Sequence, residues 1–129
     1  MNRSLTLFGL ALAIMGFVQG LVPDISANRG LWISAHVAAI QNGLILIVLG
    51  CLFDTQRLTS RLDGAIGVLC MFGLYGLWLG LSVSAALGQV SPTDSILTAT
   101  VQNVASYSLL IGFSSLLCVL MRSENRATE

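Results

Sequence analysis

The hydrophobic positions of the chain fall into four long runs separated by short polar segments. The runs cover about residues 5–22, 31–53, 64–88 and 96–121, and a charged tail follows over residues 122–129. A helix needs about 20 apolar residues to cross the hydrocarbon core of a bilayer, and each run supplies close to that number. We predict an all-α protein: a membrane-embedded four-helix bundle forming a single transmembrane domain over residues 1–129, with a frayed tail.

Composition agrees with this pattern and excludes an ordinary soluble domain. Hydrophobic residues make up 55% of the 129 residues and charged residues only 9%, whereas a soluble domain carries about 25% charged residues. Six basic and six acidic residues give a formal net charge of zero, so the chain offers no basic surface for nucleic acid. We expect the lipid bilayer to surround the protein and nucleic acid to play no part.

The arginines are distributed unequally between the two sides of the predicted membrane domain. The loop before the second run holds Arg29, and the third loop holds none. The N-terminal segment, the second loop and the tail hold the others: Arg3, Arg57, Arg61, Arg122 and Arg126. Because basic residues concentrate on the cytoplasmic side of membrane proteins, both termini are expected in the cytoplasm. We expect a multi-pass protein of the cell inner membrane.

The second apolar run carries His36, the one histidine of the chain, near its start. Polar side chains at membrane depth are costly and usually face a protein interior, a cavity or a ligand. His36 could hydrogen-bond a neighbouring helix, relay protons or bind a metal. A lone histidine is a weak signal for a bare metal ion. It suffices for haem, because the porphyrin supplies four donors and one axial position then stays open.

Three further residues are candidates for the same chemistry. Asn42 follows His36 by six positions, about 9 Å along the helix axis and about 120° around it. It could flank a shared ligand or simply bond a neighbouring helix. Tyr75 could donate its phenol proton to a developing oxyanion or anchor its helix. Arg29 could pair with a carboxylate such as a haem propionate, or remain a solvated loop residue.

Other polar and small residues have plainer interpretations. Gln102, Asn103 and Tyr107 in the fourth run could line the same cavity or bond within the helix pair. Two GxxxG stretches, Gly16–Gly20 and Gly76–Gly80, predict close helix packing. The sequence shows no nucleophile–base pair, paired carboxylates or phosphate-binding loop. Every acidic residue lies in a loop, the tail or a helix end, which argues against a proton-coupled exporter.

One stretch resembles the hydroxylaminobenzene mutase family, which is in turn similar to the styrene oxide isomerases. The matching residues are Asn28-Arg29, Leu31, Ser34-Ala35-His36, Asn42-Gly43 and Leu49-Gly50, and the Tyr75…Trp78 segment also fits. The resemblance implies a homotrimer in which the histidine ligates haem b at a subunit interface. It assigns cofactor binding to His36 and a place in the substrate pocket to Asn42 and Tyr75. Arg29 is a candidate cofactor contact from its position seven residues before His36.

The resemblance also implies a reaction. We expect an intramembrane isomerase that rearranges an arylhydroxylamine to a 2-aminophenol, with ferric haem as Lewis acid. The alternative is the conversion of an aryl epoxide to an aldehyde. The chain departs from the mutase pattern at Ala38 and Leu77, and it lacks a proline between Asn28 and Arg29. A non-catalytic membrane subunit or carrier, in which His36 and Asn42 only join helices, is a second alternative.

Overall fold

The computed structural model describes residues 3–22, 26–56 and 61–127, with the side chains of the last helix described as far as Met121. These residues form four helices and no strand: α1 (Arg3–Leu21), α2 (Arg29–Thr55), α3 (Arg61–Ala86) and α4 (Ile96–Ala127). Over the described ranges, all four are long and apolar enough to cross a membrane. The prediction of an all-α, four-span protein is confirmed.

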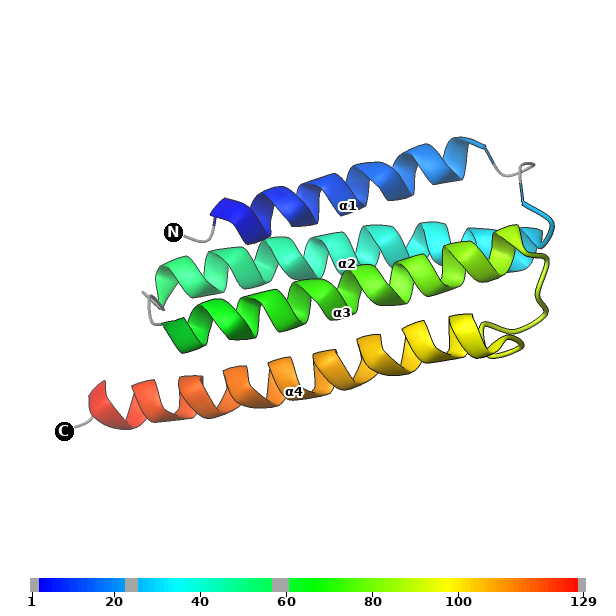
Figure 1. The fold of residues 1–129 in the computed structure, drawn as a ribbon. Helices are drawn as coiled ribbons and strands as arrows, with labels where there is room; N and C mark the ends of the chain where they lie inside the picture. The colour runs from blue at the N-terminus through cyan, green and yellow to red at the C-terminus, as the bar shows by residue number, and fades with distance from the viewer. Residues whose placement is uncertain (1–2, 23–25, 57–60, 128–129) are drawn as a thin grey trace.

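Successive helices run in alternating directions and lie beside one another (Figure 1). α1 packs against α2, α2 packs against α3, and α4 packs mainly against α3. An even number of helices brings the start of α1 and the end of α4 to the same end of the bundle (Figure 1). Which end faces the cytoplasm, and which membrane holds the protein, remain predictions from the arginine distribution.

Two helix ends differ from the prediction for local reasons. α3 stops at Ala86 because Gly88 adopts a left-handed conformation with φ +68°. The N–H of Gln89 then donates to the carbonyl oxygen of Ser84 at 3.0 Å, which is a glycine-based helix stop. α4 continues to Ala127, so the prediction of a frayed tail is wrong for residues 122–127. Alanine, glutamate and arginine favour helix, which lets α4 extend beyond its apolar run.

Asn28 fixes the start of α2 against the end of α3. Its side-chain Oδ1 accepts a hydrogen bond from the backbone N–H of Leu31 at 3.2 Å and so caps the helix. Its Nδ2 donates to the carbonyl oxygen of Gln89 at 2.6 Å. Its backbone N–H donates to the carbonyl oxygen of Ala85 at 3.1 Å. The loop that leads into the His36 segment is therefore tied to α3.

Glycines set the close approach of α1 and α2. A Cβ atom on Gly9 would lie 2.6 Å from the carbonyl oxygen of Gly43, and a Cβ on Gly43 would lie 2.6 Å from that of Gly9. A Cβ on Gly16 would lie 2.8 Å from the Cβ of Ala39. Only glycine permits this backbone contact, as expected where membrane helices pack tightly. The predicted packing role is confirmed for Gly16.

The second predicted packing motif joins α3 to α4. A Cβ on Gly76 would lie 2.8 Å from the Cβ of Ala105, and a Cβ on Gly80 would lie 2.8 Å from Nε2 of Gln102. The same Nε2 donates to the carbonyl oxygen of Leu77 at 3.3 Å. Gln102 therefore serves helix packing, which is one of its two predicted roles.

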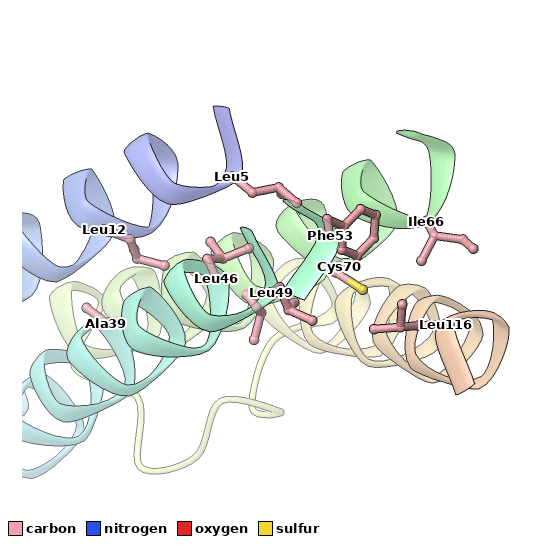
Figure 2. Packing of buried hydrophobic residues seen from close by; sticks show 10 residues of the cluster. Leu5, Leu12, Ala39, Leu46, Leu49, Phe53, Ile66, Cys70 and Leu116 are labelled. Atoms are coloured by element: carbon pink, nitrogen blue, oxygen red, sulfur yellow. The ribbon is translucent and has the colours of Figure 1, made fainter. Parts of the chain in front are cut away.

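A cluster of buried apolar residues lies toward the end of the bundle where α1 begins and α4 ends (Figure 2). Figure 2 shows Leu5 of α1, Phe53 of α2, Cys70 of α3 and Leu116 of α4 within it, so every helix contributes. Dispersion and close packing hold these side chains together. In a bilayer the hydrophobic effect does not drive helices to associate, because lipid tails are as apolar as the side chains. Gln19, Trp32 and His36 lie in the opposite half of the bundle, near the end of α1 and the start of α2.

Candidate functional site

His36 lies half-buried in the second turn of α2 and faces α1. Its Nδ1 lies 2.7 Å from the backbone carbonyl oxygen of Gly16. A carbonyl oxygen can only accept, so Nδ1 carries the proton and donates. The lone pair of the neutral ring is then on Nε2, which makes no hydrogen bond to any residue in the described part of the chain.

Gly20 provides the surface on which the imidazole ring rests. A Cβ atom at this position would lie 2.6 Å from Cε1, 2.7 Å from Nδ1 and 3.1 Å from Nε2 of His36. Gly16 and Gly20 are one helical turn apart and lie on the same side of α1. The first GxxxG stretch therefore supplies both the acceptor that orients the ring and the space that the ring occupies. Sequence reasoning saw only the packing role.

The donor set around His36 suits a cofactor that brings its own ligands. The described residues contain no group of three or more histidine, cysteine or acidic side chains that could hold a bare metal ion. Metal-ligating histidines usually donate one ring N–H to a carbonyl or carboxylate and bind the metal through the other nitrogen. His36 has this arrangement, with Nε2 free. The residues present therefore fit an iron porphyrin, for which one protein ligand suffices.

Asn42 faces a different helix from His36. It is buried, and its Nδ2 donates to the carbonyl oxygen of Leu74 in α3 at 2.9 Å. The predicted offset of about 120° around α2 agrees with these contacts, since His36 contacts α1 and Asn42 contacts α3. Within one chain the two side chains are not brought together.

Tyr75 lies at the seam between α1 and α3. Its hydroxyl donates to the carbonyl oxygen of Phe8 at 2.7 Å. Its ring packs edge-on against the rings of Phe8 and Trp78, with centroids 6.5 Å and 6.4 Å away. Tyr75 is adjacent in sequence to Leu74, whose carbonyl oxygen binds Asn42, but the Tyr75 hydroxyl is directed toward α1. Within a single chain, Tyr75 and His36 are therefore not brought together.

The remaining predicted candidates lie on the surface of the chain. Arg29 is the first residue of α2 and is exposed, two turns before His36 as predicted. Asn103 and Tyr107 are exposed on α4, and neither lines a cavity described here. Exposed polar side chains on a membrane-spanning helix are available to a neighbouring copy of the chain.

Gln19 is the residue that sequence reasoning missed. It is buried near the end of α1, and its Oε1 accepts a hydrogen bond from Nε1 of Trp78 at 2.8 Å. Its backbone carbonyl accepts one from Nε1 of Trp32 at 3.0 Å, and its Nε2 donates to Oγ of Ser82 at 3.3 Å. The available signal was a single glutamine in an otherwise apolar first span, which membrane energetics makes conspicuous.

A cavity of about 360 Å³ adjoins Gln19 where α1, α2 and α3 meet. Three apolar residues of α1, Ile14, Met15 and Val18, form one wall together with Val22, which follows the helix. Gln19, Trp32, Trp78 and Ser82 complete the lining. His36 is not among the lining residues, although it follows Trp32 by one helical turn.

Comparison with known proteins identifies the family. The family model described as styrene oxide isomerase matches residues 1–123. Hydroxylaminobenzene mutase HabA of Ectopseudomonas oleovorans is 32% identical over 80 residues, 62% of this chain and 59% of the relative. Hydroxylaminobenzene mutase HabB of the same organism is 27% identical over 86 residues, 67% of this chain and 52% of the relative.

These alignments span little more than half the length of either mutase. No solved structure matches the chain. The family model, by contrast, extends from the first residue to beyond the last predicted membrane span. The chain therefore belongs to the styrene oxide isomerase family.

Proposed function

We propose that this protein is a membrane isomerase of the hydroxylaminobenzene mutase type, which rearranges an arylhydroxylamine to a 2-aminophenol. One observation carries the proposal: an imidazole within the membrane span has Nδ1 fixed by the Gly16 carbonyl and Nε2 free. The names of the two relatives give the reaction class. The rearrangement moves oxygen from nitrogen to the ortho carbon and needs no electron donor.

Haem b held by Nε2 of His36 is the proposed cofactor. When bound, its ferric iron supplies a Lewis acid beside the substrate oxygen. The Gly16 carbonyl orients the ring, Gly20 leaves room for it, and His36 presents one nitrogen to the iron. Arg29 lies two turns away at the helix start and would pair with a carboxylate of the cofactor.

Tyr75 and Asn42 are proposed to act on the substrate oxygen. The Tyr75 hydroxyl would exchange its bond to the Phe8 carbonyl for one to the oxygen that gains charge, an interaction that strengthens in the transition state. Asn42 is held by α3 through Nδ2, and its Oδ1 would orient the substrate by accepting a hydrogen bond from the N–H or O–H of the hydroxylamine. Apolar surroundings would keep water from the reacting atoms.

The proposed active site is shared between copies of the chain. One chain directs His36 to the α1–α2 seam and Tyr75 to the α1–α3 seam. A neighbouring copy would complete the set, in a homotrimer as the resemblance implies. Such sharing would also supply enclosing walls that four helices alone do not provide for both a porphyrin and a substrate. Apolar aromatic substrates would partition into the bilayer and enter from its side.

The second candidate reaction is the conversion of an aryl epoxide to an aldehyde, which the description of the matching family model favours. The same residues would serve, since both reactions need a Lewis acid and groups that stabilise a charged oxygen. Product analysis decides between them. Purified protein is incubated separately with phenylhydroxylamine and styrene oxide, and 2-aminophenol and phenylacetaldehyde are measured.

Absorbance of the purified protein tests the cofactor and the enzyme together. We expect a Soret band and turnover of one of the two substrates, both lost in His36→Ala and the band restored by added imidazole. A colourless, fully folded protein without turnover would instead support the non-catalytic alternative, a membrane subunit or carrier in which His36 only joins helices.

A further inference from the structure

We propose that the cavity between α1, α2 and α3 is a binding site for a flat, uncharged aromatic molecule that carries a hydrogen-bond-accepting oxygen. The site is distinct from the place where the His36 ring packs against Gly16 and Gly20, in the contact between α1 and α2. It concerns binding alone, so it requires neither the cofactor nor the reaction proposed above.

The size and lining of the cavity define the apolar part of the ligand. Its volume of about 360 Å³ is within the range of small-molecule sites. Trp32 and Trp78 give it two indole walls, which favour stacking or edge contacts with another aromatic ring. Val18, 56% exposed, lies at its rim on the outer face of α1. The cavity is therefore open at the outer surface of α1, from which an apolar aromatic molecule can enter it.

Gln19 and Ser82 define the polar part of the ligand. A glutamine amide nitrogen has two hydrogens, and among the described residues Nε2 of Gln19 has one acceptor, Ser82 Oγ, at a long 3.3 Å. Oε1 of Gln19 is already engaged by Trp78. The cavity therefore offers an amide N–H and the Ser82 hydroxyl as donors. A nitro, hydroxylamine or epoxide oxygen satisfies them, whereas the lining contains no charged side chain to pair with an ion.

The two indoles are already in place before a ligand arrives. Trp78 donates its Nε1–H to the side chain of Gln19, and Trp32 donates to the backbone carbonyl of the same residue. Fixing aromatic walls in advance reduces the entropy lost on binding. Gln19 thus organises the walls and supplies the recognition group.

Fluorescence tests the site directly because Trp32 and Trp78 are the two tryptophans of the whole sequence and both line the cavity. The full-length protein in lipid nanodiscs is titrated with nitrobenzene, an aromatic quencher that carries acceptor oxygens. We expect saturable quenching that toluene reverses. Quenching that rises linearly with nitrobenzene, and is unaffected by toluene, would overturn the proposal.

Variants locate the binding. Val18→Phe fills the cavity and should abolish the saturable phase, whereas Val48→Phe, at a 65% exposed position of α2 outside the lining, should retain it. Gln19→Leu should weaken nitrobenzene binding by about fivefold or more, because it removes the amide donor for the ligand and also the acceptor that holds the Trp78 indole. Saturable quenching that survives Val18→Phe unchanged would place the ligand elsewhere and overturn the assignment. The outcome is independent of Soret absorbance and turnover, so it is separable from the test of the proposed reaction.

Discussion

The Nδ1 atom of His36 lies 2.7 Å from the carbonyl oxygen of Gly16, across the contact between α1 and α2. This relationship fixes the tautomer of the ring and determines which nitrogen is free. It also makes the chemistry of α2 depend on two small residues of α1, Gly16 and Gly20, which precede His36 by 20 and 16 residues.

Gly20→Ala should impair cofactor retention without removing a ligand. The new Cβ would lie 2.6 Å from the imidazole ring of His36 and would displace the ring from its position against α1. We expect a reduced Soret absorbance per protein. The control is Gly64→Ala, because nothing lies within 4 Å of a Cβ at that position. Equal Soret absorbance in the two variants would show that the packing of the His36 ring against Gly20 does not affect cofactor retention.

Tyr75→Phe should slow turnover while leaving the fold intact. The rings of Phe8 and Trp78 would still pack against it, but the donor to an oxygen that gains charge would be lost. We expect kcat to fall about 100-fold with little change in KM, the usual scale for losing one such donor. Tyr107→Phe, an exposed position on α4, is the matched control. A kcat equal to that of the unmodified protein would remove Tyr75 from the mechanism.

Asn42→Leu should destabilise the protein whether or not Asn42 also contacts substrate. The variant loses the buried bond from Nδ2 to the Leu74 carbonyl, which is worth about 0.5–1.5 kcal/mol. Thermal unfolding in detergent should show a lower Tm than Gln41→Leu, the exposed neighbour on α2. If the two variants unfold together, the α2–α3 bond contributes nothing measurable.

Gly43→Ala should separate α1 from α2. Its Cβ would lie 2.6 Å from the Gly9 carbonyl oxygen and 2.8 Å from the backbone nitrogen of Ala13, so backbone would have to move. Overpacking of this kind costs about 1–3 kcal/mol. Unfolding by SDS titration should require less denaturant than in Gly64→Ala. Because His36 bonds to α1, Soret absorbance should fall as well.

The number and extent of the spans could be predicted because four apolar runs of sufficient length leave the backbone no alternative in lipid. Every backbone polar group must be satisfied within its own segment, which requires helix. The end of α3 at Ala86 and the extension of α4 to Ala127 could not be read from hydropathy, since Gly88 geometry and local helix propensity decided them.

The candidate site was only partly accessible from the sequence. His36 and Asn42 stood out because polar groups are costly at membrane depth, and helical geometry placed them on different faces. The role of Gln19, in contrast, was not predicted, although Gln19 forms hydrogen bonds with Trp32, Trp78 and Ser82. Its partners are 13 to 63 residues away along the chain, and no local pattern records them.

The sequence by itself determined four helices, their approximate ends and the presence of a polar imidazole within the second. Tertiary structure decided which nitrogen of His36 is free, which helix Asn42 binds and where Gln19 gathers its two indoles. The physical reason is that these helices are apolar on every side, so hydrophobic periodicity does not mark the buried face. The fit of small residues such as Gly9 against Gly43 selects that face, and only the folded chain brings them into contact.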